Sequence, residues 1–522
     1  MKVELYDTTL RDGAQTQGIS FSVSDKLRIA EKLDSFGMHY IEGGWPGANP
    51  KDIDFFKKAK NKKFKNSKLV AFGSTRRPGA SASKDPTLKG LLGAGTDAIT
   101  IFGKSWDLHV KEVLKTTPDE NLKMIEESVE YLKSKGKFVI FDAEHFFDGY
   151  GTNPEYALKS LAAAEKGGAD RIVLCDTNGG MLTTSVFEIV EKTRKEIKVS
   201  LGIHAHNDSD MAVANSVAAV EAGCVHVQGT MNGYGERCGN ANLISVIANL
   251  KLKLGVDCVS DLALKDLTET AYYIAETSNM KLSDNQPFVG SSAFAHKAGV
   301  HVNAIMKNPK TYEHVDPERV GNKRMLLISE LSGKSSILKK AGDMDMGLEK
   351  EAPATKKILK TLQDMEHKGY HFEAAEASLE LFMKRAVKKF KKFFELKDFR
   401  VIIEKRSDRK ITSEATIKIK VGDKLEHTAS LGDGPVNALD FALRKALKDF
   451  YPALNEMHLT DFKVRVLDEK AATAARVRVL IQSQDRTDSW WTIGVSENII
   501  EASWQALVDS VEYKLLKDSE KH

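Results

Sequence analysis

The first 255 residues alternate between short apolar runs and longer amphipathic segments, and no other feature of the sequence constrains the fold as strongly. The amphipathic segments have helical spacing, and Gly37 and the pair Gly167 and Gly168 stand where two of them should end. The apolar runs have the length of buried strands. They are VELYD (3–7), YIEGG (40–44), KLVAFG (68–73), AITIFG (98–103), KFVIFDAE (137–144), RIVLCD (171–176), VSLGIHAH (199–206) and VHVQGT (225–230). Strands that alternate with helices run parallel and are joined by right-handed crossovers.

Eight strand–helix units in about 250 residues are the number and size of a closed (β/α)₈ barrel, also called a TIM barrel. An open, doubly wound sheet is the competing fold, but it would need a glycine-rich fingerprint after the first strand. The sequence there is DTTLRDG, which is not such a fingerprint, and neither is the GYGERCGN that follows the eighth strand. We therefore predict an α/β protein in which residues 1–270 form a catalytic barrel.

The pattern changes twice after the predicted barrel. Residues 256–395 are predicted to be mainly helical, with glycine and proline breaks, and we assign 271–395 to a linker and a helical subdomain. Farther along, three period-two runs precede a helical run at 437–450, and the same scheme recurs before a helical run at 498–516. Residues 396–522 are therefore predicted to be an α+β regulatory or dimerisation domain made of two βββα halves.

The composition argues against several classes of protein. The 77 basic and 73 acidic residues nearly balance, which is not expected of a nucleic-acid binder. The four cysteines form no CxxC pair, as is usual in a reducing cytoplasm. The N-terminus lacks the regions of a signal peptide, and no apolar run approaches the ~18 residues of a membrane span. We therefore expect a cytoplasmic protein that binds neither nucleic acids nor membranes.

Polar residues follow the predicted strands where a barrel carries its chemistry, at the carboxyl ends. Arg11 and Asp12 follow the first strand, and His204 and His206 end the seventh. Residues i and i+2 of a strand share a face, so both imidazoles can point into one site. Two imidazoles and a carboxylate bind a divalent ion, and Asn240 after the eighth strand could add a carbonyl oxygen. This mixed set of nitrogen and oxygen ligands suits Mg²⁺, Mn²⁺ or Zn²⁺.

Further candidates occupy equivalent places. Glu42 ends the second strand, Glu144 ends the fifth, and Thr177 follows the sixth. The two glutamates could instead be solvated residues of the barrel rim. Cys175 is expected to be an inert buried thiol, because no histidine or cation is tied to it by sequence. His301 lies beyond the predicted barrel, where a plain surface position is the alternative to a role in the site.

Four motifs, in the order DTTLRDGAQ, IEGG, HAHND and GYGERCGNANL, resemble the family of metal-dependent acyl-CoA-condensing barrels that includes the isopropylmalate, homocitrate and citramalate synthases. The resemblance covers essentially the whole chain. Four further stretches, FDAEHFFDGYGTNPEYAL, CDTNGGML, YEHVDPERVGN and SWWTIGVSENIIEASWQAL, look most like the citramalate branch. Ala14 stands where many isopropylmalate synthases have a glutamate, which also points away from that branch.

The resemblance implies a Claisen-type condensation of pyruvate with acetyl-CoA, then thioester hydrolysis to (R)-citramalate and CoA, the first step of a threonine-independent route to isoleucine. It implies a divalent metal ion held by Asp12, His204, His206 and, as a further ligand, Asn240. It assigns substrate contacts to Arg11, Gln15, Glu42 and Thr177, and catalytic roles to Arg11, Glu144, His301 and Tyr312. We expect His301 to be the base, because a neutral imidazole is available near pH 7, with Glu144 orienting or sharing the proton and Tyr312 holding the network.

The resemblance also implies a homodimer. In the family, residues that match His301 and Tyr312 reach the active site of a neighbouring subunit. The C-terminal domain is expected to pair across the dimer and bind an amino-acid effector, isoleucine or leucine, with dimerisation alone as the alternative. Three other functions stay open: a 2-isopropylmalate synthase acting on 2-oxoisovalerate, a non-haem iron oxygenase with the same ligand set, and a non-catalytic amino-acid sensor.

Overall fold

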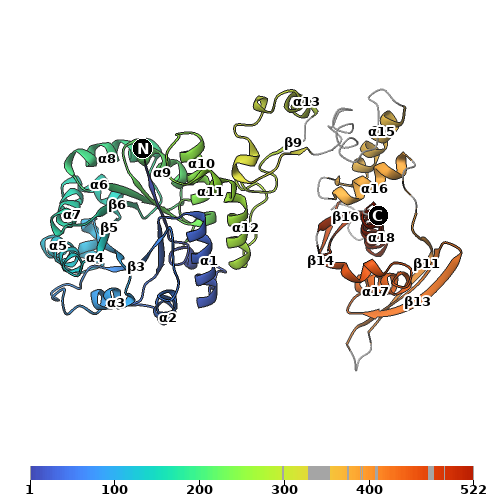
Figure 1. Ribbon diagram of the computed structural model, residues 1–522, viewed down its shortest axis with the longest axis horizontal. Helices are drawn as coiled ribbons and strands as arrows, with labels where there is room; N and C mark the ends of the chain where they lie inside the picture. Colours follow the sequence, from blue (N-terminus) through green and yellow to red (C-terminus); the bar gives the residue numbers. More distant parts are fainter. Residues whose placement is uncertain are drawn as a thin grey trace. The chain divides into compact units, whose positions relative to one another are not determined.

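The computed structural model describes residues 2–296, 299–326, 353–372, 375–387, 390, 392–405, 410–467, 475–486 and 488–520. Within them, eight parallel strands form a closed barrel in chain order, because β1 pairs with both β2 and β8 (Figure 1). The strands are β1 (Glu4–Asp7), β2 (Tyr40–Gly44), β3 (Lys68–Ser74), β4 (Ala98–Lys104), β5 (Phe138–Glu144), β6 (Arg171–Asp176), β7 (Leu201–Ala205) and β8 (His226–Gly229). The predicted (β/α)₈ barrel is confirmed, and the open sheet is excluded.

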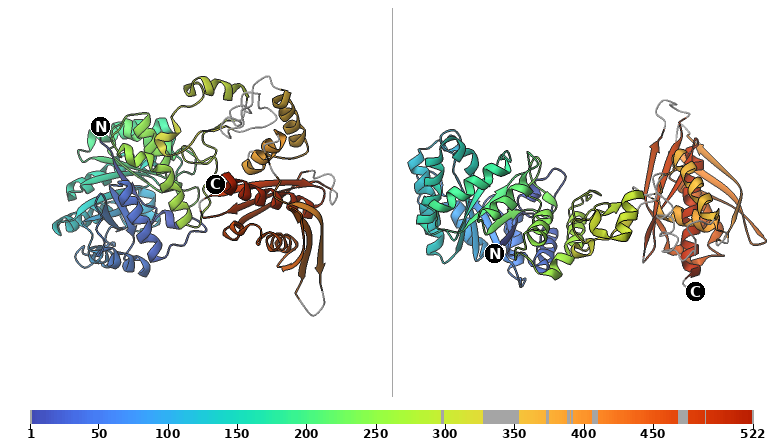
Figure 2. Two further views of the ribbon diagram at one scale, coloured as in Figure 1. Left: turned by 45° about the vertical axis from the view of Figure 1, so that its right-hand side comes forward. Right: turned by 90° about the horizontal axis from the view of Figure 1, so that it is seen from above.

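Helices follow the strands and surround the barrel (Figures 1 and 2). They are α1 (Val23–Phe36), α2 (Pro50–Ala59), α3 (Pro86–Ala94), α4 (Asp107–Glu112), α5 (Pro118–Ser134), α6 (Phe146–Thr152), α7 (Pro154–Gly167), α8 (Thr183–Glu196), α9 (Ala212–Glu221) and α10 (Leu243–Leu252). Ser22 and Asp25 form a capping box that starts α1, and Gly37, with a φ of 96°, ends it. Gly168 ends α7 in the same way, with a φ of 90°. Both glycines thus stand where the sequence predicts helix ends.

The chain beyond the barrel contributes to two compact units. Residues 1–294 and 314–324 make up the first unit, and 295–313 and 325–522 make up the second. The elements of this stretch are α11 (Asp261–Lys265), α12 (Leu267–Thr277), β9 (Ala295–His296), α13 (Gly299–Lys307), β10 (Met325–Leu326), α15 (Pro353–His367) and α16 (Glu376–Ala386). The domain boundaries at residues 270 and 395 stay predictions.

The C-terminal part of the second unit contains the two predicted βββα halves (Figure 2). Each half has three antiparallel strands in chain order and one helix packed on them. The first half consists of β11 (Glu395–Glu404), β12 (Thr412–Val421), β13 (Lys424–Gly432) and α17 (Pro435–Leu447), and the second of β14 (His458–Val466), β15 (Val477–Gln484), β16 (Ser489–Ser496) and α18 (Ile499–Glu520). Inward residues of both halves, such as Ile417 and Ile481, share one apolar core. Among the described residues, no helix has the length and apolar character needed to cross a membrane.

A buried ion pair fixes the loop between β2 and α2. Lys26 and Asp52 are 3% and 4% exposed, and the Lys26 ammonium contacts the Asp52 carboxylate and donates to the carbonyl oxygen of Gly43 at 3.0 Å. The other Asp52 oxygen accepts the backbone N–H of Trp45 at 2.9 Å. Gly44 has a φ of 142°, and a Cβ there would lie 2.3 Å from the Asp52 carboxyl carbon. The pair therefore sets the position of Trp45 at the carboxyl end of the barrel.

We predict that Lys26→Met lowers the free energy of unfolding by about 3–5 kcal/mol, because Asp52 would be left buried without its cation. Lys57→Met is the matched control, since the Lys57 side chain is 70% exposed and pairs with Asp54 only at 3.6 Å. The control should change the free energy of unfolding by less than about 1 kcal/mol. Denaturant unfolding of both variants measures the difference, and equal effects would contradict this account of the loop.

Candidate metal centre and substrate cavity

A cavity of about 220 Å³ lies at the carboxyl ends of the barrel strands. It brings together residues that are far apart in the chain, from the turn after β1 to the end of β7. Its walls consist of Arg11, Asp12, Gln15, Trp45, Phe72, Phe102, Asp142, Glu144, Cys175, Thr177, His204 and His206. We call this space the site cavity. Seven of the residues singled out from the sequence as site candidates line it, namely Arg11, Asp12, Gln15, Glu144, Thr177, His204 and His206.

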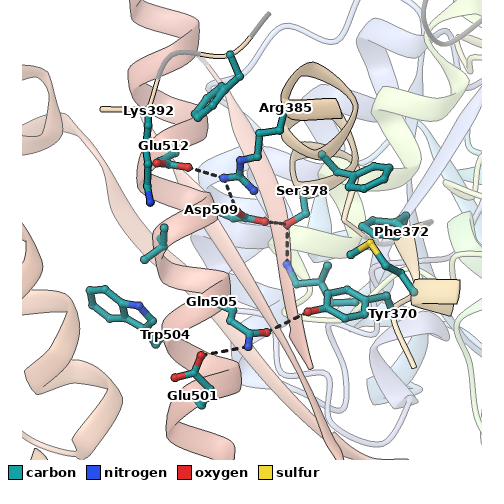
Figure 3. Close-up of a pocket in the computed structure, with 15 residues that line it drawn as sticks. Tyr370, Phe372, Ser378, Arg385, Lys392, Glu501, Trp504, Gln505, Asp509 and Glu512 are labelled. Atoms are coloured by element: carbon teal, nitrogen blue, oxygen red, sulfur yellow. Dashed lines mark hydrogen bonds and ion pairs between the residues drawn. The ribbon is translucent and has the colours of Figure 1, made fainter. Parts of the chain in front are cut away.

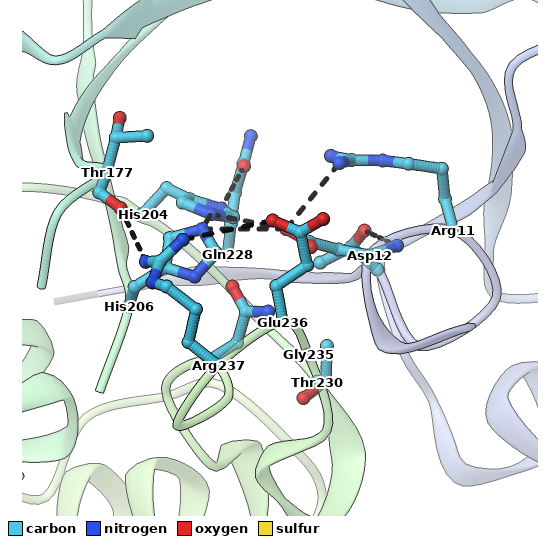
Figure 4. A network of polar contacts seen from close by, with 12 residues as sticks. Arg11, Asp12, Thr177, His204, His206, Gln228, Thr230, Gly235, Glu236 and Arg237 are labelled. Atoms are coloured by element: carbon cyan, nitrogen blue, oxygen red, sulfur yellow. Dashed lines mark hydrogen bonds and ion pairs between the residues drawn. The ribbon is translucent and has the colours of Figure 1, made fainter. Parts of the chain in front are cut away.

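Asp12, His204 and His206 converge in the site cavity and are buried (Figure 4). One Asp12 oxygen lies 3.6 Å from Nε2 of His204 and 3.8 Å from Nε2 of His206, and the two Nε2 atoms are 3.3 Å apart. Atoms that share one ion through bonds of about 2.0–2.2 Å are separated by distances of this size. The three side chains are thus arranged as ligands of a single ion would be.

The protonation states of these residues suit a cation. Burial lowers the pKa of His204, and burial together with the neighbouring His204 lowers the pKa of His206 to about 4. Burial acts to raise the pKa of Asp12, but the charge of Arg11 holds it below its usual value. Neutral imidazoles and an ionised carboxylate are the forms in which these groups bind metals.

A second layer of hydrogen bonds orients His204. Nδ1 of His204 lies 3.0 Å from Oε1 of Gln228, and Nε2 of Gln228 donates to Asp142 at 2.9 Å. Because the amide oxygen faces the imidazole, Nδ1 is the donor and Nε2 keeps its lone pair for the centre. Burial, and secondarily the charge of Glu42, raises the pKa of Asp142 to about 8. Gln228 and Asp142 were not found by the sequence analysis, although Asp142 lies two residues before Glu144 on the same face of β5.

Asn240 lies beside His206, and the backbones of the two residues form a β-bridge. Its Oδ1 is buried without a hydrogen-bond partner, while its Nδ2 donates to the carbonyl oxygen of Tyr234 at 3.2 Å. Gly235 has a φ of 157°, and a Cβ there would lie 2.2 Å from Nδ2 of Asn240. The lack of a side chain at Gly235 therefore leaves room for the Asn240 amide, and its unpartnered oxygen suits a cation.

Glu42 is fully buried and holds Arg11 in place. It accepts hydrogen bonds from the Tyr6 hydroxyl, from Thr8 Oγ1 at 2.6 Å and from Arg11 Nε. The Arg11 guanidinium carbon lies 3.7 Å from the centre of the Phe72 ring. The interpretation of Glu42 as a solvated rim residue is therefore wrong, because three donors compensate its charge inside the protein.

The opposite side of the site cavity carries Thr177, Glu144 and Cys175. Thr177 Oγ1 accepts the backbone N–H of His145 at 2.8 Å, and Glu144 pairs with Lys104. Glu144 is thus held by a cation and is not merely solvated. Burial raises the pKa of Cys175 well above its usual value, as expected of an inert thiol.

Three aromatic side chains form one wall of the site cavity. Trp45 packs edge-on against Phe72 and Phe102, with ring centres 5.8 and 5.7 Å away, and the two phenylalanines stack at 5.5 Å. None of the three is among the site residues predicted from the sequence. Period-two alternation along β3 and β4 places Phe72 and Phe102 on the inward face, which was the available signal.

His301 and Tyr312 lie in the second unit, on α13 and directly after the short helix Pro309–Thr311. Their rings are in contact, with centres 4.1 Å apart, and both side chains are exposed. The structure thus places His301 and Tyr312 in direct contact. Their part in the chemistry of the barrel stays a prediction.

A larger pocket, of about 490 Å³, lies in the second unit between α16 and α18 (Figure 3). Arg385 on α16 pairs with Asp509 and Glu512 on α18, at 2.9 Å for Asp509. Aromatic side chains such as Phe372 and Trp504 line the rest of it. Its charged groups mainly pair with one another and join the two helices.

Three family models together match most of the chain. The HMGL-like family model matches residues 2–274, a model described as homocitrate synthase post-HMGL domain-like matches 288–369, and the LeuA allosteric (dimerisation) domain model matches 373–515.

Several relatives match over nearly their full length. The (R)-citramalate synthase of Aquifex aeolicus is 58% identical over 521 residues, which are 99% of both chains. That of Geobacter sulfurreducens is 56% identical over 99% of this chain and 98% of its own. The 2-isopropylmalate synthase of Methanocaldococcus jannaschii is 31% identical over 100% of this chain and 96% of its own. With the barrel and its metal-suited centre, these matches show that the chain belongs to the HMGL-like family, in the branch of the (R)-citramalate synthases.

Proposed function

We propose that this protein condenses pyruvate with acetyl-CoA and water to give (R)-citramalate and CoA, and so starts a threonine-independent route to isoleucine. The observation that carries the proposal is the convergence of Asp12, His204 and His206 in a cavity that also contains Arg11 and Thr177. Five (R)-citramalate synthases at 45–58% identity over nearly the full length support the choice of substrates. Two relatives named as 2-isopropylmalate synthases, one of them as probable, match at 31% and 30%.

We propose that Asp12, His204 and His206 hold one divalent ion, Mg²⁺, Mn²⁺ or Zn²⁺, with Asn240 as a further oxygen ligand. The neutral imidazoles and the unpartnered Oδ1 of Asn240 support this ligand set. When bound, the ion supplies Lewis-acid polarisation of the keto group of pyruvate. Gln228 binds Nδ1 of His204 and so leaves Nε2 available to the ion.

Three polar side chains bind the keto acid in this scheme. Arg11 is locked by Glu42 and Phe72, so its guanidinium offers a fixed cation where negative charge develops on the keto oxygen. Thr177 Oγ1 already accepts a hydrogen bond from His145, so its own proton remains free to be donated to the carboxylate of pyruvate. Gln15 lines the same cavity and completes the set of polar contacts.

His301 is proposed as the base that removes a proton from the acetyl methyl group. The methyl carbon then forms a bond to C2 of pyruvate, and the keto oxygen takes up a proton. Water afterwards cleaves the thioester and releases CoA as a thiol. Glu144 orients or shares the proton, and Tyr312, whose ring touches His301, holds the imidazole. We propose a homodimer in which these residues serve the site of the partner subunit.

The C-terminal part is proposed to regulate the barrel. Its match to the LeuA allosteric (dimerisation) domain supports a pairing of two subunits and an amino-acid effector, isoleucine or leucine. Dimerisation without an effector is the alternative. Titration with either amino acid separates the two, because only an effector changes the rate of CoA release.

We predict that pyruvate is turned over with a kcat/KM at least about a hundred-fold above that of 2-oxoisovalerate, because a wall of three aromatic rings limits the room for a branched chain. Release of CoA from acetyl-CoA, followed with a thiol reagent, measures both reactions, and EDTA should stop them. Preference for 2-oxoisovalerate would indicate an isopropylmalate synthase. Oxygen consumption with Fe²⁺ and no CoA release would indicate an oxygenase, and inertness toward every keto acid would indicate a sensor.

We predict that Gln228→Leu weakens binding of the metal ion about 10- to 100-fold, because His204 loses the acceptor that fixes its ring. Calorimetric titration of metal-free protein with Mn²⁺ measures the affinity. Gln505→Leu is the matched control, since the Gln505 amide accepts hydrogen bonds from Tyr370 and Val495 in the second unit. Unchanged affinity in a folded Gln228→Leu variant would contradict the proposed orientation of His204.

A further inference from the structure

Lys104 is a cation beside the site cavity that the proposed chemistry does not yet use. It is the last residue of β4, and it lies directly opposite Glu144, the last residue of β5, in the register of the two strands. Its ammonium contacts Oε2 of Glu144. The two side chains are 12% and 24% exposed, so both are largely removed from solvent.

The backbone on both sides of this ion pair is fixed. The buried Asn121 donates to the carbonyl oxygen of Lys104 at 2.8 Å, and it contacts the Tyr156 hydroxyl at 2.8 Å. The N–H of Ser105 donates to the carbonyl oxygen of Glu144 at 3.1 Å. The pair therefore joins two rigid strand ends and does not depend on the conformation of a loop.

The surroundings leave Lys104 one acidic partner. Among the described residues, Glu144 is the carboxylate that lies within ion-pair distance of its ammonium. The Phe102 ring centre lies 5.5 Å from the ammonium. Burial, together with the charges of His145 and Lys104, lowers the pKa of the nearby His109. The charge of Lys104 thus acts mainly on Glu144.

We propose that Lys104 is a positioning residue that holds Glu144 by Oε2 and thereby presents Oε1 to the acetyl group in the site cavity. A lysine ammonium is a compact charge that holds one oxygen, whereas an arginine can hold both oxygens of a carboxylate. Glu144 itself lines the cavity, so the oxygen that Lys104 does not hold is the one available there. This inference rests on the proposed role of Glu144 in the proton transfer.

The stability of the fold does not explain the pair. A largely buried ion pair contributes little net stability, because the cost of desolvating both charges offsets their attraction, and the strands are already joined by their backbone hydrogen bonds. A misplaced catalytic group, in contrast, can slow a reaction about a hundred-fold. The position of the pair at the edge of the site cavity therefore indicates a role in the rate of the reaction and not in the stability of the fold.

The test is a double-mutant cycle on the full-length, metal-loaded enzyme, with Lys104→Met, Glu144→Gln and the double variant. Lys104→Met should lower kcat about a hundred-fold and leave the KM of pyruvate within about two-fold, because the keto acid is held by other residues. Lys104→Arg should recover only part of the activity, since it retains the cation but can also hold the second oxygen of Glu144. The double variant should be no slower than Glu144→Gln alone, because Lys104 acts through Glu144.

The matched control is Lys133→Met, which removes a lysine paired with Asp170 at 2.6 Å, where Asp170 precedes β6 at the opposite end of the barrel. It should leave kcat unchanged. A double variant slower than Glu144→Gln by the full factor would overturn the inference, as would a rise in the KM of acetyl-CoA at unchanged kcat. Full activity of Glu144→Gln would instead refute the proposed role of Glu144 itself, which distinguishes the two failures.

Discussion

The closure of the barrel between β1 and β8 is the constraint on which the site depends. Pairing of these strands brings the turn after β1, with Arg11 and Asp12, next to the ends of β7 and β8. Only then does the Asp12 carboxylate meet the imidazoles of His204 and His206, almost two hundred residues farther along. Burial keeps both imidazoles neutral, and Arg11 keeps the carboxylate ionised. The fold thus assembles a set of ligands and puts each of them in the form that binds a cation.

Charge inside the barrel is compensated in layers. Glu42 forms an ion pair with Arg11 and accepts hydrogen bonds from two hydroxyl groups, so neither charge is buried without a partner. Gln228 accepts a hydrogen bond from His204 and donates one to Asp142, which fixes the orientation of the His204 ring. The Lys26–Asp52 pair fixes the loop that brings Trp45 to the same cavity. Breaking a compensated pair of this kind costs more than the pair contributes, because one charge stays buried without its partner. These layers explain why a small cavity needs so many polar residues around it.

The strand order and the location of the site could be predicted from the sequence, because both depend on local periodicity. The eight apolar runs and the polar residues that end them were enough to place Asp12, His204 and His206 together. The partners of these residues could not be predicted in the same way. Lys104 faces Glu144, and His204 faces Gln228, only through the register of neighbouring strands, which a single sequence does not contain. Glu42 lies within β2, two residues before the strand ends, and its three donors lie on β1 and the turn after it, so they come together only once the barrel is closed.

The account is tested most directly by locating the metal ion. A crystal structure of the enzyme soaked with Mn²⁺, with anomalous scattering recorded at the manganese edge, shows which side chains bind it. We expect one anomalous peak per chain, within bonding distance of Asp12, His204 and His206, and loss of both the peak and the CoA release in Asp12→Asn. A peak elsewhere with these three side chains turned apart, or undiminished turnover by metal-stripped enzyme, would contradict the account.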